Sequence, residues 1–275
     1  MGRFRNGQVV GHFWIGLIKA GYIHGVANED GLATGNNIAF IYPDGETALK
    51  GYFENKYMKN AKFVEVQKYG CDENGMFVAT EFTKPLSQDE FFYDPPTNIS
   101  FGGGSINVPD PYEAKTVYVD VSKIPNSGEG VFLKKDLPAK RLACFYSLYM
   151  YNENQNKLYV NNHVANISKT AEYRRNCRKY SISLSYYDAA INIPPEFDVE
   201  PYPTLGPKVN HHFQLNNSVY HIAEHPRWGL IQSVTTKIDL KVGQELFTYY
   251  GYKEMSFPED FPWYWEMKSN LERVP

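Results

Sequence analysis

The first hundred residues alternate between short apolar runs and turn-forming residues. Examples are GHFWIG at 11–16, FIYPDG at 40–45 and KGYFE at 50–54. Short alternating runs separated by Gly, Asn and Asp predict successive β-hairpins. Tyr42-Pro43-Asp44-Gly45 supplies turn chemistry, because Pro fixes φ, Asp can close a turn with its side chain and Gly adopts positive φ. The element recurs about every 20–25 residues, which predicts a β-repeat array that packs on neighbouring structure.

The pattern changes after residue 116. The stretch VYVDV at 117–121 alternates as a strand, and SGEGVF at 127–132 is a tight turn that leads into another. Further short strands are expected within 142–149, 180–186, 229–235 and 245–250. Only 169–179 and 263–271 are typical of helices. Residues 94–112 look like a linker, and the GGG at 102–104 is interpreted as a turn, since no Lys-Ser/Thr follows as in a phosphate loop. The predicted fold is mostly β.

Composition narrows the classes of function. The chain has 275 residues, 43% hydrophobic content and a net charge of −3, with no strongly basic region. These values predict a packed core and argue against DNA binding through phosphate neutralisation. No apolar run reaches the length of a membrane span, and the polar N-terminus is unlike a signal peptide. The three cysteines, Cys71, Cys144 and Cys177, form neither a disulfide framework nor a CxxC site, which favours a reducing compartment.

Histidines gather in GPKVNHHF at 206–213 and in HIAEH at 221–225. A zinc site needs about four ligands at suitable spacing, and no nearby Cys completes a known pattern. Glu224 could act as a metalloprotease-like base, but the order is not HExxH and Pro226 disfavours a helix at His225. A Cys–His nucleophile has no independent support either. Taken alone, these histidines favour a structural role, and no metal is expected.

In combination, several ordered motifs resemble a known family. The Asn210-His211 pair and the ending GQELFTYYGY at 243–252 resemble the two signatures of the SET domain. The SGEG at 127–130 looks like the opening cofactor loop of that family, and the Phe-Tyr ending at Tyr146 looks like its first substrate-channel tyrosine. Residues 38–53 are similar to a MORN repeat. The chain thus resembles SET-domain protein lysine methyltransferases with N-terminal MORN repeats.

The resemblance implies a domain order, an activity and a set of site residues. It implies a MORN-repeat β-hairpin region at 1–105, a SET domain (β-clip) of short sheets at 106–255 and a post-SET segment with a C-terminal helix at 256–275. It implies methyl transfer from S-adenosylmethionine to a lysine side chain of a protein substrate. Nucleic acid and membrane are not expected as partners, the oligomeric state is left open, and the expected location is the nucleus, the cytoplasm or both.

The family's channel and cofactor roles transfer residue by residue. The implied substrate-channel tyrosines, with Tyr250 nearest the transferred methyl group, are Tyr146, Tyr220, Tyr250 and Tyr252. Lys208 would pair with the cofactor carboxylate, and Asn210 and His211 would hold its amino acid and adenine portions. The other implied cofactor-binding residues are Gly128, Glu129 and Gly130, where the backbone approaches closely, and Trp263, which would stack on the adenine.

Several departures from the family fall at the expected active site, and one of them replaces a glycine with a larger residue. A Gly-Asn pair of the family corresponds here to Lys179-Tyr180 or Tyr180-Ser181. A large side chain at a close-approach position typically costs about 1–3 kcal/mol, so it could weaken cofactor binding. Two further hypotheses therefore stand beside the methyltransferase. One is a repurposed or inactive SET scaffold that binds a small molecule or a protein through the tyrosine channel, and the other is a scaffold driven by its MORN repeats.

Overall fold

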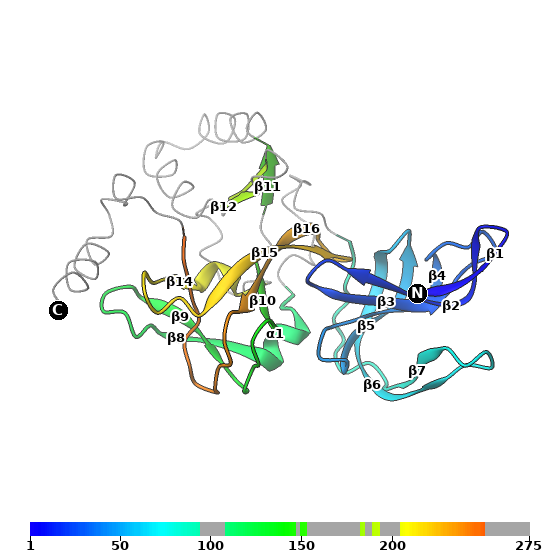
Figure 1. Cartoon of the computed structure of the whole chain (residues 1–275), viewed down its shortest axis with the longest axis horizontal. Coiled ribbons are helices and arrows are strands. Elements are labelled where there is room, and N and C mark those ends of the chain that lie inside the picture. The colour runs from blue at the N-terminus through cyan, green and yellow to red at the C-terminus, as the bar shows by residue number, and fades with distance from the viewer. Residues whose placement is uncertain (94–107, 147–148, 153–181, 185–188, 193–203, 251–275) are drawn as a thin grey trace.

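The computed structural model of the protein describes residues 1–93, 108–146, 149–152, 182–184, 189–192 and 204–250. The helices predicted at 169–179 and 263–271 lie outside these residues, as does the predicted domain boundary between 105 and 106. Seven of the described strands occupy one end of the molecule, and the remaining sheets lie toward the other end, with a short helix between them and the seven strands (Figure 1). The mostly-β prediction, with an N-terminal hairpin array, is confirmed.

The N-terminal strands form one antiparallel meander in which each strand pairs with the next in sequence. Adjacent pairing of this kind needs only short connections, which the turn residues in the sequence supply. The seven strands are β1 (Gly2–Arg5), β2 (Gln8–Leu17), β3 (Gly21–Val26), β4 (Gly35–Ile41), β5 (Thr47–Glu54), β6 (Tyr57–Cys71) and β7 (Phe77–Phe82). We call this sheet the repeat sheet.

The turn between β4 and β5 has the chemistry that its sequence predicts. Gly45 adopts a φ of 76°, and its N–H donates to the carbonyl of Tyr42 at 3.0 Å. The Asp44 carboxylate accepts from the N–H groups of Glu46 and Thr47 at 3.0 and 2.9 Å. Pro43, Asp44 and Gly45 therefore shape this turn by local interactions, and the Tyr69 hydroxyl of β6 adds a bond to the Gly45 carbonyl.

Beyond the repeat sheet, short strands form both hairpins and pairs between segments far apart in the chain. The central sheet has the order β10 (Leu142–Tyr146), β16 (Gly229–Thr236) and β15 (Ser218–His225), all antiparallel. Two further pairs are β8 (Val117–Val121) with β9 (Glu129–Leu133), antiparallel, and β14 (Asn210–His211) with β17 (Phe247–Thr248), parallel. A third sheet has the order β11 (Tyr149–Asn152), β13 (Ala189–Asn192) and β12 (Ile182–Leu184).

Two elements differ from the sequence prediction. The stretch that resembled a linker ends in helix α1 (Pro111–Thr116), which follows an Asp110 N-cap whose carboxylate accepts from the N–H groups of Tyr112 and Glu113. With six residues the helix is too short for a helical period, so only its Asp-Pro start could have indicated it. The HIAEH stretch, for which no secondary structure was predicted, lies at the end of strand β15.

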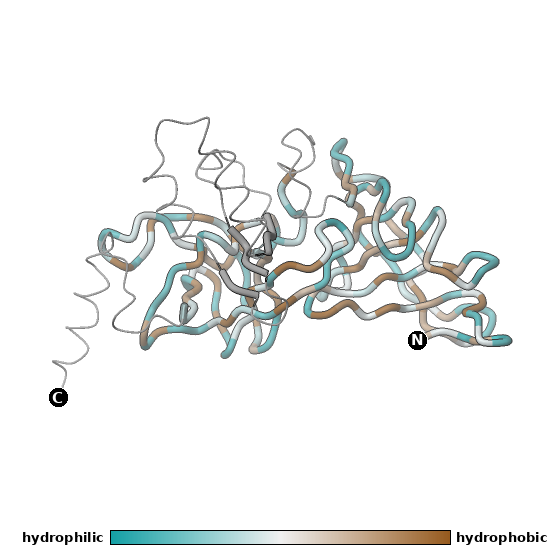
Figure 2. The backbone as a smooth tube through the Cα atoms, turned by 90° about the horizontal axis from the view of Figure 1, so that it is seen from above, coloured by the Kyte–Doolittle hydropathy of each residue, from teal (hydrophilic) through white to brown (hydrophobic). Residues whose placement is uncertain are grey.

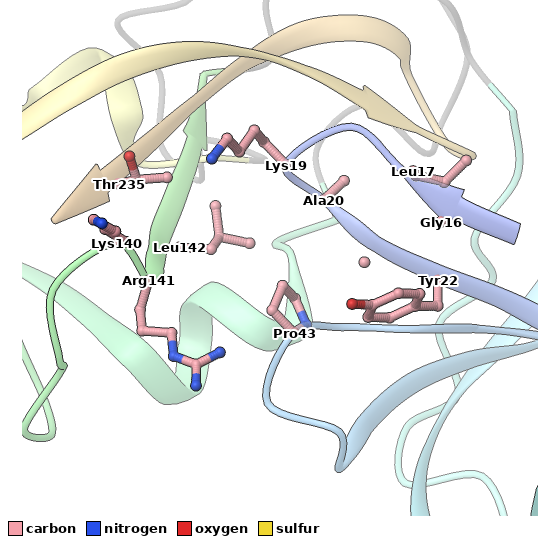
Figure 3. Close-up of a pocket in the computed structure, with 11 residues that line it drawn as sticks. Gly16, Leu17, Lys19, Ala20, Tyr22, Pro43, Lys140, Arg141, Leu142 and Thr235 are labelled. Atoms are coloured by element: carbon pink, nitrogen blue, oxygen red, sulfur yellow. The ribbon is translucent and has the colours of Figure 1, made fainter. Parts of the chain in front are cut away.

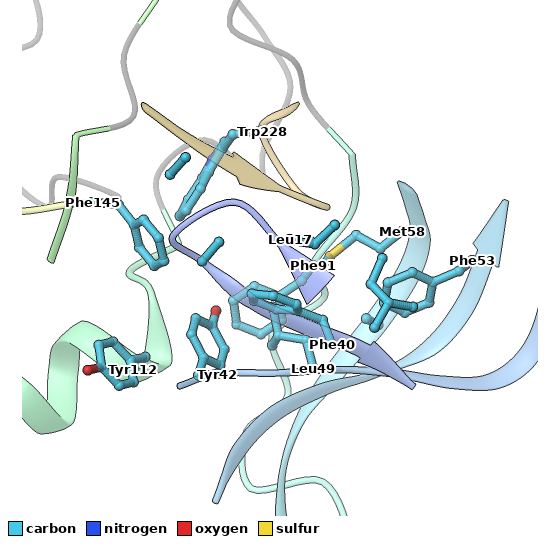
Figure 4. Close-up of a cluster of buried hydrophobic side chains, with 14 of the residues drawn as sticks. Leu17, Phe40, Tyr42, Leu49, Phe53, Met58, Phe91, Tyr112, Phe145 and Trp228 are labelled. Carbon is cyan, nitrogen blue, oxygen red and sulfur yellow. The ribbon is translucent and has the colours of Figure 1, made fainter. Parts of the chain in front are cut away.

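The repeat sheet and the following domain share one hydrophobic core. Phe40 of β4, Tyr42 just after β4 and Leu49 of β5 pack in the same cluster as Tyr112, Phe145 and Trp228, and all six are buried (Figure 4). Along the backbone, hydrophobic and hydrophilic stretches alternate in short runs, as strands with one buried face require (Figure 2). The repeat sheet thus covers its apolar face with the neighbouring domain.

Candidate functional site

Three segments that are far apart in the chain, 142–146, 206–211 and 247–248, meet at the parallel pair β14 and β17. Asn210 and His211 of β14 pair in register with Phe247 and Thr248 of β17. The 3₁₀ turn Gly206–Lys208 leads directly into this pair. Gly206 lies so close to β10 that a Cβ atom at this position would be 2.4 Å from the carbonyl oxygen of Phe145. Only glycine therefore permits the turn to rest on β10.

His211 is a buried, neutral anchor for β17. Burial lowers the pKa of His211 to about 4, so its ring carries no charge at neutral pH. Its Nδ1 atom lies 3.1 Å from the backbone N of Tyr250 and 3.2 Å from the carbonyl oxygen of Thr248. A neutral ring can accept from the first or donate to the second through Nδ1, and either tautomer ties the ring to the start of the tyrosine-rich ending.

Asn210 connects the predicted cofactor loop to a buried carboxylate. Its amide nitrogen donates to the carbonyl of Glu129 at 2.8 Å and lies 3.4 Å from Oε1 of Glu245. Glu245 is 2% exposed and also accepts from the Ser122 hydroxyl at 2.6 Å and the Lys123 N–H at 2.7 Å. Asn210 and Glu245 thus hold the 122–130 loop against β14.

Gly128 and Gly130 of that loop have different surroundings. A Cβ atom on Gly130 would lie 2.1 Å from Oε1 of Glu245, so this glycine makes room for the protein's own carboxylate. No atom of the described residues lies within 4 Å of the place that a Cβ on Gly128 would take, and Gly128 adopts a φ of 77°, a conformation that favours glycine. Among the described residues, the space beside Gly130 is therefore filled, whereas that beside Gly128 is not. Sequence reasoning assigned no role to Glu245, although a Glu before the apolar pair Leu246-Phe247 was a visible signal.

Lys208 and Glu129 form a partly exposed ion pair beside the predicted cofactor loop. Lys208 Nζ lies 2.9 Å from Oε2 of Glu129, and the two side chains are 24% and 48% exposed. A pair at this depth contributes little to stability. It does place one cation and one anion beside Gly128. This pair of opposite charges suits an amino acid zwitterion, because the carboxylate of the zwitterion needs a cation and its ammonium group needs an acceptor.

Three of the four predicted channel tyrosines converge. The ring centroid of Tyr220 lies 5.8 Å from that of Tyr146 and 6.3 Å from that of Tyr250. The Tyr250 hydroxyl donates to the carbonyl of Val209, next to Asn210. Burial, and next the neighbouring Tyr146, raise the pKa of Tyr220, so its phenol stays protonated. Tyr252 and Trp263 lie outside the described residues, as do Lys179, Tyr180 and Ser181.

Other candidate features lie away from this site. Within the described residues, no group of three or more His, Cys, Asp or Glu could hold a metal ion, and no helix is long and apolar enough to cross a membrane. A surface cleft of about 300 Å³ lies where the β2–β3 turn faces β10 (Figure 3). Its lining includes Lys19, Lys140 and Arg141 but none of the predicted site residues.

The sequence of the chain is similar to those of known histone methyltransferases. Residues 4–75 match the family model described as "Histone H3 K4-specific methyltransferase SET7 N-terminal". The matched residues lie within the repeat sheet, which is thus similar to the N-terminal part of SET7-type proteins. Over 254 residues the chain is 32% identical to the histone-lysine N-methyltransferase SETD7 of Halocynthia roretzi. The aligned region covers 92% of this chain and 61% of that protein. The chain spans about three-fifths of the length of this curated relative.

Solved SET proteins are also similar. A SET8 from Cryptosporidium aligns over 50% of this chain and 60% of its own, with 15% identity and a TM-score of 0.37. The Chaetomium thermophilum polycomb repressive complex 2, in an autoinhibited conformation bound to S-adenosylmethionine, aligns over 58% of this chain and 17% of its own, with 18% identity and a TM-score of 0.36. Scores this low carry no argument about the site. The family model and the curated relative confirm the resemblance to SET-domain proteins with N-terminal repeats.

Proposed function

We propose that the chain transfers a methyl group from S-adenosylmethionine to a lysine side chain of a protein substrate. The observation that carries the proposal is the convergence of Tyr146, Tyr220 and Tyr250 beside the Asn210-His211 pair. The similarity to a curated histone-lysine methyltransferase supports the same reaction class. We accordingly expect a histone or another lysine-containing protein as substrate, in the nucleus, the cytoplasm or both.

The residues of the cofactor side supply complementary charge. In our proposal Lys208 binds the carboxylate of S-adenosylmethionine, and Glu129 and the Asn210 segment contact its amino acid portion. When bound there, the group supplies a methyl activated by a positively charged sulfur. Gly128 has no side chain that would occupy the space for S-adenosylmethionine beside the loop. The neutral His211 holds the backbone of Thr248 and Tyr250 in place. Trp263 stays a candidate for stacking on the adenine.

The tyrosines prepare the acceptor. The lysine amine must arrive neutral, in line with the methyl group and shielded from water, and orientation alone can account for effective molarities of about 10⁵ M or more. Phenol rings exclude water, and the Tyr220 hydroxyl, which stays protonated, orients the amine by hydrogen bonding rather than removing its proton. We assign these tasks to Tyr146, Tyr220 and Tyr250, together with Tyr252.

Transfer of labelled methyl groups to a panel of lysine peptides, including an N-terminal histone H3 peptide, tests the proposal. The full chain should label at least one peptide, and Tyr220→Phe, which keeps the ring but loses the hydroxyl, should label it at least tenfold more slowly. Tyr118→Phe, at a partly buried tyrosine of β8, is the matched control and should label at the wild-type rate. Absence of labelling by the wild-type chain, beside an active SET enzyme, would count against the proposal.

A second function is a SET scaffold that binds a ligand or partner without methyl transfer. The observation that favours it is the Glu245 carboxylate, which fills the space beside Gly130 in the predicted cofactor loop. Under this reading S-adenosylmethionine either fails to bind or binds without turnover. Calorimetric titration of the full chain, run beside the labelling assay, separates these two outcomes from the enzyme.

A further inference from the structure

One buried carboxylate links the two walls of the candidate site. Glu113, in the first turn of α1, is 2% exposed. Its Oε1 accepts a hydrogen bond from the N–H of Phe145, and its Oε2 accepts one from the N–H of Leu205 at 2.7 Å. Phe145 precedes the channel residue Tyr146, and Leu205 precedes the turn that carries Lys208. A single side chain thus joins the tyrosine wall to the proposed cofactor wall.

The two backbone donors have no strand partner for these bonds. β10 is an edge strand in the three-stranded sheet that the described residues form. An N–H on an edge needs water or a side chain to satisfy it, and inside a core only a side chain is available. The carboxylate of Glu113 satisfies one N–H from each segment. Gly206, whose missing Cβ lets the turn rest on Phe145 and Tyr146, shows that the segments pack backbone against backbone there.

Burial of this acid opposes its charge. Desolvation and the neighbouring Asp110 raise the pKa of Glu113, while the two backbone donors and Arg227 act in the opposite direction. A buried carboxylate is costly compared with an apolar side chain of similar size. Its two bonds to separate segments give it a use that apolar packing cannot reproduce, because only directional contacts fix the register of one backbone against another.

We propose that Glu113 is a positioning residue that holds the Tyr146 wall and the Lys208–Asn210 wall at the separation that methyl transfer requires. This inference rests on the proposed function. Glu113 touches neither substrate nor cofactor in this proposal and acts through the two backbones. Loss of the two Glu113 bonds misaligns the methyl donor and the lysine acceptor, so it lowers kcat. The residues that contact S-adenosylmethionine remain together on one segment.

Three variants of the full chain separate positioning from a purely structural role. Glu113→Gln keeps one acceptor but turns an NH₂ group toward a backbone donor. Glu113→Asp keeps the negative charge beside Arg227 but retracts the carboxylate by about 1.5 Å, so it cannot reach both donors. Asp110→Asn is the matched control, because Asp110 is buried in the same cluster and caps the same helix but bonds neither wall.

Amide hydrogen exchange provides a readout that needs no activity. In Glu113→Gln and Glu113→Asp, segments 142–146 and 204–211 should exchange faster together, whereas Asp110→Asn should leave both close to wild type. In the transfer assay, kcat should fall at least tenfold in both Glu113 variants, with the dissociation constant for S-adenosylmethionine changed less than threefold. Asp110→Asn should retain kcat within twofold at equal folded fraction.

Two results would overturn the inference. One is unchanged exchange in both segments of the Glu113 variants. The other is a kcat in Glu113→Asp equal to that of the wild type, since charge balance rather than bridging would then be the role of Glu113. If Glu113→Gln does not fold, Glu113→Asp carries the test. Failure of the wild-type chain to bind S-adenosylmethionine would refute the proposed function and the positioning role with it, and the exchange data would still decide whether Glu113 clamps the segments.

Discussion

The repeat sheet and the candidate site are built by opposite kinds of contact. In the repeat sheet every strand pairs with its neighbour in sequence, from β1 to β7. In the site, β14 pairs with β17 and β10 pairs with β16, so each contact joins segments far apart in the chain. Local pairing is fixed by turns, whereas distant pairing must be fixed by side chains and close backbone approach. Buried polar groups accordingly gather where distant segments meet.

The boundary between the two regions shows this difference most clearly. Tyr42 of the segment after β4 donates its hydroxyl to Asp110 at 2.6 Å, and its ring stacks on Tyr112 at a centroid distance of 5.3 Å. Arg227, fully buried, lies over the rings of Phe91 and Trp228 at 5.2 and 4.6 Å. The repeat sheet therefore packs against the residues that support the site.

The largest expected effect follows from removing the charge of Arg227. Its positive charge opposes the upward pKa shifts of Asp110 and Glu113, so Arg227→Met leaves two buried acids without that compensation. Loss of one partner from a buried ionic cluster costs about 3–5 kcal/mol. Arg141→Met, the same change at an exposed arginine, should stay within about 0.5 kcal/mol of wild type. Urea unfolding followed by circular dichroism measures both.

That experiment also tests whether the two regions share one core. With a shared core, Arg227→Met unfolds the repeat sheet and the site in one transition at lower urea. A variant in which the repeat sheet unfolds at the wild-type urea concentration, while the site is lost earlier, would show that the two regions are independent.

A smaller effect separates two glycines, one from each region. A Cβ on Gly51 of β5 would lie 2.1 Å from the backbone oxygen of Asn60, whereas on Gly130 it would meet the side chain of Glu245. Backbone cannot move as readily as a side chain, so Gly51→Ala should cost about 3 kcal/mol and Gly130→Ala about 1 kcal/mol. Thermal unfolding measures the two costs. Gly130→Ala should weaken binding of S-adenosylmethionine, and Gly51→Ala should not; equal binding by both variants would contradict the proposed loop.

The effect that is smallest at neutral pH is the pH dependence from His211. Its folded pKa of about 4 lies below the ordinary value of 6.5, so between these values the unfolded chain binds a proton that the folded chain does not. Its stabilising contribution is complete above pH 6.5 and is lost as the pH falls toward 4, with a slope of at most about 1.4 kcal/mol per pH unit. His211→Gln should flatten the fall of unfolding free energy across this window. Parallel curves for the two proteins would show that His211 is not held neutral.

The contrast between local and distant contacts also explains what the sequence could predict. The β4–β5 hairpin was predictable because the turn chemistry of Pro43, Asp44 and Gly45 is visible in the local sequence. The ordered motifs around Asn210 and Tyr250 were recognisable through a family, and the structure brings Tyr146 and Tyr220 to the same place. Whether these residues act as the family implies stays a prediction.

What could not be predicted depends on contacts between distant segments. Helix α1 is too short for a periodic signal, and the bonds of Glu113 to Phe145 and Leu205 exist only once three segments have folded together. Gly130 was expected to admit the cofactor, and its neighbour turns out to be Glu245, more than a hundred residues away in sequence. No local pattern encodes such a pairing.

Calorimetric titration of the full chain with S-adenosylmethionine tests most directly whether the segments around Gly128 and Lys208 bind this cofactor. We expect one site per chain, at least tenfold weaker binding in Lys208→Gln, and unchanged binding in Lys59→Gln, which breaks a comparable exposed pair with Glu54 at 2.8 Å in the repeat sheet. Heat of binding that is absent in the wild-type chain, or equal in Lys208→Gln and Lys59→Gln, would contradict the assignment.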